Sequence, residues 1–113
     1  MRYYSEEKMK DLRSAFDGQV LGWPGVTTKK MFGCPCYRVG GKLFAFLVTN
    51  GVVITCLPDR DRNRLARTCA ITAFEAGGKR VRAWAKVPVR GPRDLTAILP
   101  FVRSSYQAAR EGT

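Results

Sequence analysis

Two pairs of turn residues constrain the fold of this chain more than any other feature of its sequence. Gly40-Gly41 and Asn50-Gly51 each lie between runs of β-branched and aromatic residues. Such pairs favour two-residue hairpin turns, because their backbones readily adopt the positive φ angles that these turns require. We therefore expect residues 29–57 to form three antiparallel strands joined by two tight turns.

The two turns also predict which residues face one another across the strands. If each loop contains only the two turn residues, the register of both hairpins follows directly. The predicted pairs are Val39–Lys42, Tyr37–Phe44 and Cys36–Ala45 in the first hairpin, and Val48–Val53 and Ala45–Cys56 in the second.

Both faces of this three-stranded unit are predicted to be apolar, because side chains alternate between the faces along a strand. A sheet with one face in water would instead alternate apolar and polar residues. We therefore expect helices to cover one face, and a partner or a second copy of the chain to cover at least part of the other. One face carries Cys34, Cys36, Leu43, Ala45, Leu47, Val52, Ile54 and Cys56, and the other carries Tyr37, Val39, Phe44, Phe46, Val48, Val53 and Leu57.

Composition limits the chemistry that the chain can perform. With 20 Lys and Arg against 9 Asp and Glu, the 113 residues carry a formal charge of +11 and contain no histidine. Because histidine is the side chain that most often acts as acid, base or metal ligand, catalysis of the Ser-His-Asp or Cys-His type within one chain is excluded. A chain of this length is expected to form a single domain over residues 1–113.

We also expect a soluble cytoplasmic protein without a membrane partner. No signal peptide is recognised before the first predicted helix, and the apolar run over residues 43–57 is interrupted by Thr49-Asn50-Gly51. That run is too short to span a bilayer.

Four cysteines, Cys34, Cys36, Cys56 and Cys69, raise the question of disulfides or metal. In a reducing cytoplasm free thiols are expected. The predicted register separates Cys36 from Cys56 by two strand spacings, about 9–10 Å, whereas a disulfide needs Cα atoms within about 7 Å. A zinc site is the alternative, but Cys34-Pro35-Cys36 has a single intervening residue and no histidine is available to complete a set. We predict packing roles, with no metal and no cofactor.

The rest of the chain completes an α+β pattern. A helix is predicted from Ser5 to Gly18, a short arginine-rich surface helix from Pro58-Asp59, two strands over residues 69–74 and 81–87, and a last helix after Gly91-Pro92 that Pro100 bends or splits. The predicted fold is a two-layer α-β(3)-α-β(2)-α arrangement with a mainly antiparallel sheet and the helices on one face.

Several short motifs in this order resemble the N-terminal domain of the TfoX (Sxy) competence-regulator family, over residues 8–109. They are Lys30-Met31-Phe32-Gly33, YRVGGKLFAF from Tyr37, VITCLP from Val53, Phe74 with Gly78, RAWAKVP from Arg82, and a closing Ser-Tyr-Gln-Ala-Ala. The resemblance, which extends to YjbR-type domains, implies a small α+β domain without an agreed enzymatic activity. Cys34-Pro35-Cys36 departs from the small residues usual after Met-Phe-Gly, and the C-terminal domain of full-length TfoX regulators is not present in this sequence.

The first functional hypothesis is a regulatory or protein-interaction domain that forms a homodimer or binds another protein. Its basis is the doubly apolar sheet together with Trp84, which is predicted on a polar strand face, since aromatic side chains among charges are typical interface anchors. The alternative is that the sheet aromatics are ordinary core residues. The predicted interaction surface comprises Tyr37, Phe44, Phe46 and Trp84.

The second hypothesis is weak, salt-sensitive binding of nucleic acid with low sequence specificity. Residues 79–93 contain six basic residues and no acid, with Trp84 among them, and residues 60–67 add four arginines. This is the charge pattern of a phosphate binder, although no helix-turn-helix, RNA-recognition or zinc-finger motif accompanies it. The predicted contacts are Arg60, Arg62, Arg64, Arg67, Lys79, Arg80, Arg82 and Lys86.

An enzymatic role is the third alternative, and we do not expect it. The only candidate nucleophile is Cys34, near Lys29 and Lys30, because a reactive thiol needs a pKa lowered by a cation or a helix N-terminus. A P-loop and a dinucleotide-binding glycine pattern are both missing from the sequence.

Overall fold

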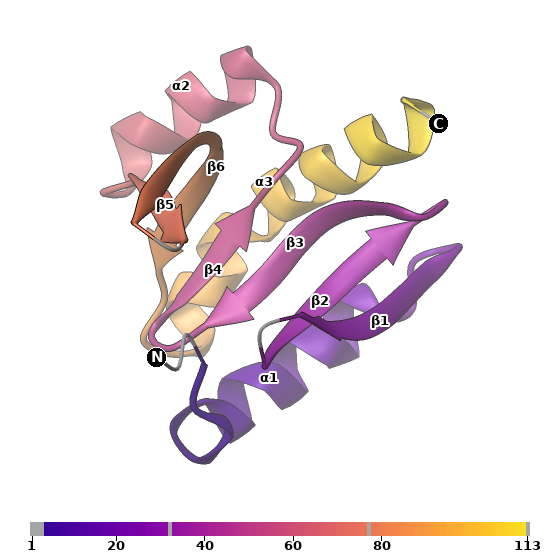
Figure 1. Cartoon of the computed structure of the whole chain (residues 1–113), viewed down its shortest axis with the longest axis vertical. Coiled ribbons are helices and arrows are strands. Elements are labelled where there is room, and N and C mark those ends of the chain that lie inside the picture. The colour runs from indigo at the N-terminus through magenta and orange to yellow at the C-terminus, as the bar shows by residue number, and fades with distance from the viewer. Residues whose placement is uncertain (1–3, 32, 77, 113) are drawn as a thin grey trace.

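The computed structural model describes residues 4–31, 33–76 and 78–112, without the side chains of Ala76 and Arg82. Phe32, which belongs to the Lys30-Met31-Phe32-Gly33 motif, and Gly77 lie outside the described residues. Within the described part, three helices and six strands follow one another along the chain (Figure 1). Their bounds are α1 Glu6–Val20, β1 Val26–Met31, β2 Cys34–Val39, β3 Lys42–Val48, β4 Gly51–Ile54, α2 Asp59–Thr68, β5 Thr72–Ala76, β6 Lys79–Pro88 and α3 Pro92–Glu111.

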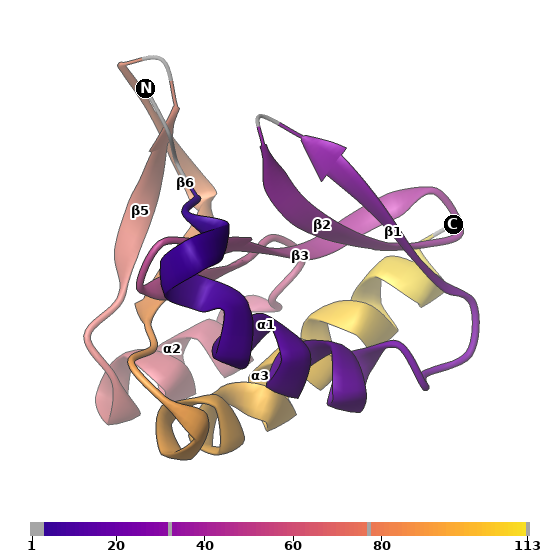
Figure 2. The same ribbon diagram turned by 90° about the horizontal axis from the view of Figure 1, so that it is seen from below.

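The predicted α+β class is confirmed. The described strands form one antiparallel sheet in the order β1-β2-β3-β4-β6-β5, and the helices lie on one side of it (Figure 2). The predicted number of strands before α2 was wrong, because four form instead of three. Residues 26–31 form a separate strand that pairs along its whole length with β2, from Val26–Val39 to Met31–Cys34.

The first hairpin turn is confirmed and the second is shifted by one residue. Gly40 and Gly41 have φ angles of 58° and 79°, and Val39 pairs with Lys42 as predicted. The second loop is Thr49-Asn50, with Asn50 at φ 62°, and Gly51 pairs with Val48 as the first residue of β4. The predicted pairs Val48–Val53 and Ala45–Cys56 are therefore wrong, and Ala45 pairs with Ile54. Asparagine tolerates the left-handed region well enough to replace glycine in the turn.

A register shift between Tyr37 and Arg38 corrects the predicted pairing of β2 with β3. Tyr37 pairs with Ala45, and Cys36 pairs with Phe46, in place of the predicted Tyr37–Phe44 and Cys36–Ala45. One additional residue of β3 is accommodated at this point, as in a β-bulge. The faces predicted for residues 34–37 of β2 are therefore exchanged relative to β3, whereas Arg38 and Val39 keep the predicted pairing.

The helices contribute one apolar side each. In α1 the buried residues recur at helical spacing, Met9, Leu12, Phe16 and Val20, and the helix runs two residues past the predicted end at Gly18. Within α2, all of whose residues are described, only Leu65 is buried, which confirms the predicted surface helix.

The helix α3 is continuous from Pro92 to Glu111, so of the bend or split predicted at Pro100, the split does not occur. Proline removes one intrahelical hydrogen bond, but residues on both sides of it are anchored in the core. Leu95 and Ile98 precede it and Val102 and Tyr106 follow it, each 3% exposed or less. Tertiary packing therefore holds the helix together through the proline.

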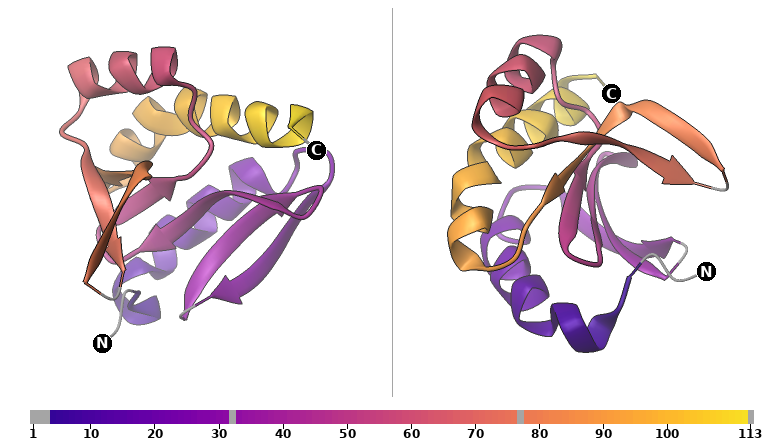
Figure 3. Two further views of the ribbon diagram at one scale, coloured as in Figure 1. Left: turned by 45° about the horizontal axis from the view of Figure 1, so that its top comes forward. Right: turned by 90° about the vertical axis from the view of Figure 1, so that its left-hand side faces the viewer.

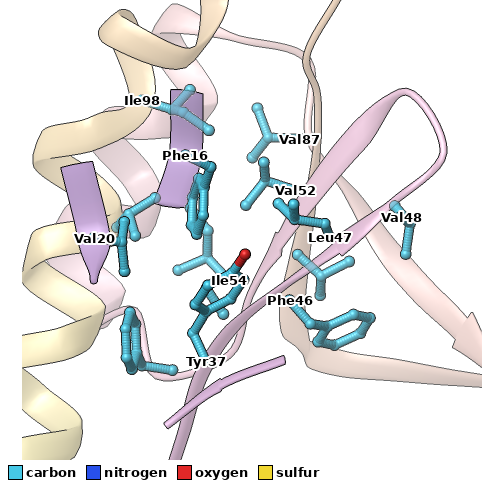
Figure 4. Packing of buried hydrophobic residues seen from close by; sticks show 14 of the residues in the cluster. Phe16, Val20, Tyr37, Phe46, Leu47, Val48, Val52, Ile54, Val87 and Ile98 are labelled. Carbon is cyan, nitrogen blue, oxygen red and sulfur yellow. The ribbon is translucent and has the colours of Figure 1, made fainter. Parts of the chain in front are cut away.

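The main core lies between the sheet and the α1 and α3 helices (Figure 4). Figure 4 shows Phe16, Val20 and Ile98 from the helices pointing toward Leu47, Val52 and Val87 from the strands. No helix in the described part of the chain combines the length and the apolar character needed to cross a bilayer.

Candidate nucleic-acid interface

The face of the sheet that the helices do not cover is concave. The β1–β2 and β5–β6 hairpins project from this side as two arms, and β3 and β4 lie between them (Figures 2 and 3). The curvature follows from strand twist together with the register shifts in β2–β3 and β5–β6, since such irregularities increase twist locally. We call this side the concave face.

One cross-strand row shows the character of the concave face. Successive pairings connect Lys29 to Cys36, Cys36 to Phe46, Phe46 to Val53, and Val53 to Lys86. Residues that pair directly lie on the same side of a sheet. The three central residues are at most 2% exposed, whereas Lys29 is exposed and Lys86 is half-buried. An apolar centre is thus flanked by a cation on each side.

Aromatic rings fill the concave face beside this row. The ring centroids of Phe46 lie 5.1 Å from Phe74 and 5.4 Å from Trp84, both in edge-to-face geometry. Phe46 and Phe74 are 2% and 5% exposed, and Trp84 is half-buried. The sequence predicted Trp84 on a polar strand face, among charged residues. In the structure it packs against Phe46 and Phe74 instead, and it keeps part of its surface accessible to solvent.

An open pocket of about 690 Å³ lies against this cluster. Threonine hydroxyls and charged side chains line it alongside Phe74, so its walls mix apolar and polar groups. The lining residues are Val48, Thr49, Thr72, Ala73, Phe74, Glu75, Arg80 and Lys86.

Cations predominate over acids on the two arms. Lys29, Lys30 and Lys79 are exposed, and none of them forms an ion pair among the described residues. Arg80 lies 3.5 Å from Glu75, but both side chains are more than 60% exposed, so solvent screens this pair. The side chain of Arg82, a predicted contact, lies outside the described residues.

The predicted arginine contacts on α2 occupy a different place from the basic residues of β6. The α2 helix lies in the helical layer beside α3, whereas the β5–β6 arm projects from the other side of the sheet (Figure 2). Arg60, Arg64 and Arg67 are exposed, and Arg62 is half-buried. The structure therefore does not bring the two predicted groups of basic residues onto one surface.

Two of the four predicted interaction residues belong to the main core instead. Tyr37 packs edge-to-face on Phe16 of α1 with ring centroids 4.8 Å apart, and Phe44 packs on Tyr106 of α3 at 5.4 Å. Both are 0% exposed. Phe46 is buried on the concave face, and only Trp84 keeps partial access to solvent. Among the described residues, the one large apolar side chain recorded as exposed is Leu21, at 44%.

The thiols are placed for packing, and none of the four cysteines, all of which are described, forms a disulfide. Burial, together with the neighbouring Cys36, raises the pKa of Cys34 to about 11. Burial likewise raises the pKa of Cys36, whose Sγ donates to the Cys34 carbonyl at 3.4 Å. A thiol with a raised pKa is a weak nucleophile at neutral pH, so the environment expected of a reactive Cys34 is not present. Within the described residues no group of three or more potential ligands is arranged for a metal ion.

Sequence reasoning missed Lys29 and Phe74 as parts of this surface. Lys29 was predicted at the start of the first of three strands, and not in a separate strand that pairs with β2 and places it opposite Cys36. Phe74 was predicted in a strand, but only the shift between Ala73 and Phe74 brings its ring to Trp84, with centroids 6.1 Å apart.

Comparison with known proteins adds no relative: no protein family, curated protein or solved structure matches the chain. The resemblance to TfoX N-terminal domains stays a prediction.

Proposed function

We propose that this chain is a non-catalytic, nucleic-acid-binding domain of low sequence specificity, and that the concave face contacts the nucleic acid. The observation that carries the proposal is the row in which Lys29 and Lys86 flank a buried apolar centre on the uncovered side of the sheet. With neighbouring strands about 4.8 Å apart, the four strand steps between the two lysines span about 19 Å along the sheet. Two lysines at that separation can contact different phosphates of one strand.

The charge of the whole chain supports the same partner. A formal charge of +11 on 113 residues attracts polyanions and raises their rate of association. Lysine and arginine contacts to phosphates carry little sequence information, so the expected binding is general and depends strongly on salt.

The regulatory, self-associating role predicted from the sequence ranks second in this proposal. Of the four aromatic residues predicted to form its surface, the monomer itself buries Tyr37, Phe44 and Phe46, and only Trp84 stays partly exposed. Two copies that each carry +11 would also repel one another at low salt. A protein partner, if there is one, would have to be acidic to match the arms.

The proposal is tested by fluorescence anisotropy with labelled DNA of about 20 nucleotides, single-stranded and duplex, at 50 to 200 mM salt. We expect the logarithm of the association constant to fall linearly with the logarithm of the salt concentration, with a slope of about 0.7 per phosphate contact for a single strand. Light scattering of the protein alone, over the same range of salt, measures self-association independently. Absence of binding to either DNA at 50 mM salt would refute the proposal, and a stable dimer in that buffer would favour the regulatory role instead.

A further inference from the structure

We infer that the concave face binds single-stranded nucleic acid in preference to duplex, with a nucleobase stacked on Trp84. This inference rests on the proposed function and specifies its ligand.

Trp84 is held by two other aromatic side chains on the concave face. Phe46 and Phe74 contact the indole at centroid distances of 5.4 and 6.1 Å, yet the residue is only half-buried. The ring is therefore packed against two other aromatic rings, while the residue keeps part of its surface in contact with solvent. An aromatic ring fixed in this way can stack on a base of any identity, because every base has a π face, and little conformational freedom is lost on binding.

A cation and several polar side chains lie near Trp84. Lys86 lies two residues along β6, so its side chain leaves the same face of the strand. The open pocket described above lies beside Phe74, whose ring contacts Trp84, but Trp84 itself does not line it. Its lining carries cations at Lys86 and Arg80, one acid at Glu75, and threonines at 49 and 72. A stacking platform, a phosphate contact and hydrogen-bonding groups thus lie within one region, as binding a nucleotide of a flexible strand requires.

A duplex cannot use this combination. Its bases are stacked on one another and paired, so they present no free face to Trp84 unless a base is flipped out at a cost of a few kcal/mol. Duplex would therefore contact the arms through phosphates alone, and single strands gain the stacking contribution in addition.

The experiment uses a Trp23→Phe variant of the full chain, in which Trp84 is the single tryptophan. Titration with oligo(dT) of about 12 nucleotides is expected to quench the fluorescence of Trp84, whereas a duplex of equal length quenches it little at equal saturation. In the chain that retains Trp23, Trp84→Leu is expected to weaken oligo(dT) binding about 10-fold or more, by anisotropy, and Trp84→Phe much less. Duplex binding is expected to change less than about 2-fold in both variants. Thermal unfolding of each variant shows that the domain is folded at the temperature of the titration.

The outcomes separate the two proposals. If labelled oligo(dT) binds but Trp84→Leu and Trp84→Phe bind it as tightly as the unchanged chain, the stacking site is wrong and the proposed function stands. Tighter binding of duplex than of oligo(dT) also overturns the inference. If neither nucleic acid binds at 50 mM salt, the proposed function fails and the inference fails with it. Should Trp23→Phe not fold, the comparison of Trp84→Leu with Trp84→Phe decides alone.

Discussion

The Tyr37 hydroxyl donates a hydrogen bond to the Asp17 carboxylate and thereby ties β2 to α1. Burial and this hydrogen bond raise the pKa of Tyr37, so the phenol stays protonated and remains a donor at neutral pH. We expect Tyr37→Phe to lower the free energy of unfolding by about 1–2 kcal/mol, because a hydrogen bond to a charged acceptor is lost. Urea denaturation measures the change.

Tyr106→Phe is the matched control, because its hydroxyl donates to the neutral carbonyl of Pro24 at 2.6 Å. We expect it to cost about 1 kcal/mol or less. A larger loss for Tyr106→Phe than for Tyr37→Phe would contradict this assignment.

The position of Tyr37 also shows where sequence reasoning reaches its limit. The glycines at 40 and 41 predicted the hairpin and its first pair correctly, because turn chemistry is local. The shift between Tyr37 and Arg38 has no local signal, and it pairs Tyr37 with Ala45 in place of the predicted Phe44. The sequence likewise could not show that Tyr37 packs on Phe16 of α1 and belongs to the core.

Glycine is needed at position 51 because the backbone of β6 lies very close to it, and not because a turn requires it. A Cβ at this position would lie 3.0 Å from the Val87 carbonyl oxygen and 3.4 Å from Val48. We expect Gly51→Ala to destabilise the domain by about 1–3 kcal/mol, because the backbone of β6 would have to shift. Gly22→Ala is the control, since nothing lies within 4 Å of its Cβ position. Equal stability of both variants in urea would exclude the close contact.

Ser105 is a buried polar residue of α3 that connects β3 to the segment following β4. Its Oγ donates to the Phe44 carbonyl at 2.7 Å and accepts from the Cys56 backbone N–H at 2.9 Å. We expect Ser105→Ala to lower the free energy of unfolding by about 1–3 kcal/mol, because the Cys56 N–H loses its acceptor in a buried setting. The half-buried neighbour Ser104 provides the control, and Ser104→Ala should change stability by less than about 0.5 kcal/mol. A result in which the two variants are equally stable would argue against the bridge.

The basic residues show a second limit of prediction from sequence. Composition alone identified a polyanion as a plausible partner, because net charge does not depend on the fold. It could not show that α2 lies in the helical layer while the β5–β6 arm projects from the other side of the sheet (Figure 2), since this depends on β6 inserting next to β4. Nor could it place Lys29 opposite Cys36, because the pairing of residues 26–31 with β2 as a separate strand was not predicted.

Burial of Cys34 and Cys36 predicts slow thiol chemistry. Since the pKa of Cys34 is raised to about 11, little thiolate is present at pH 8 in the folded chain. The half-buried Cys56 and Cys69 should react first with a thiol reagent such as DTNB, and Cys34 and Cys36 only after unfolding in guanidinium. Peptide mapping of the alkylated protein identifies the sites. Rapid labelling of Cys34 in the native state would show that its thiol is accessible and reactive, and would contradict the packing role assigned to it.

The two basic groups can be separated by paired charge removal. We expect the double variant Lys29→Gln/Lys86→Gln to weaken oligo(dT) binding and to reduce the salt slope by about 1.4, since each single-strand phosphate contact contributes about 0.7. Arg60→Gln/Arg67→Gln removes the same charge from the exposed side of α2 and is expected to leave the slope unchanged. Because both variants have a net charge two units lower, a general effect of charge would weaken binding equally in the two. Equal losses would therefore show that binding follows net charge alone, and a larger loss in the α2 variant would place the nucleic acid on the helical layer instead of the concave face.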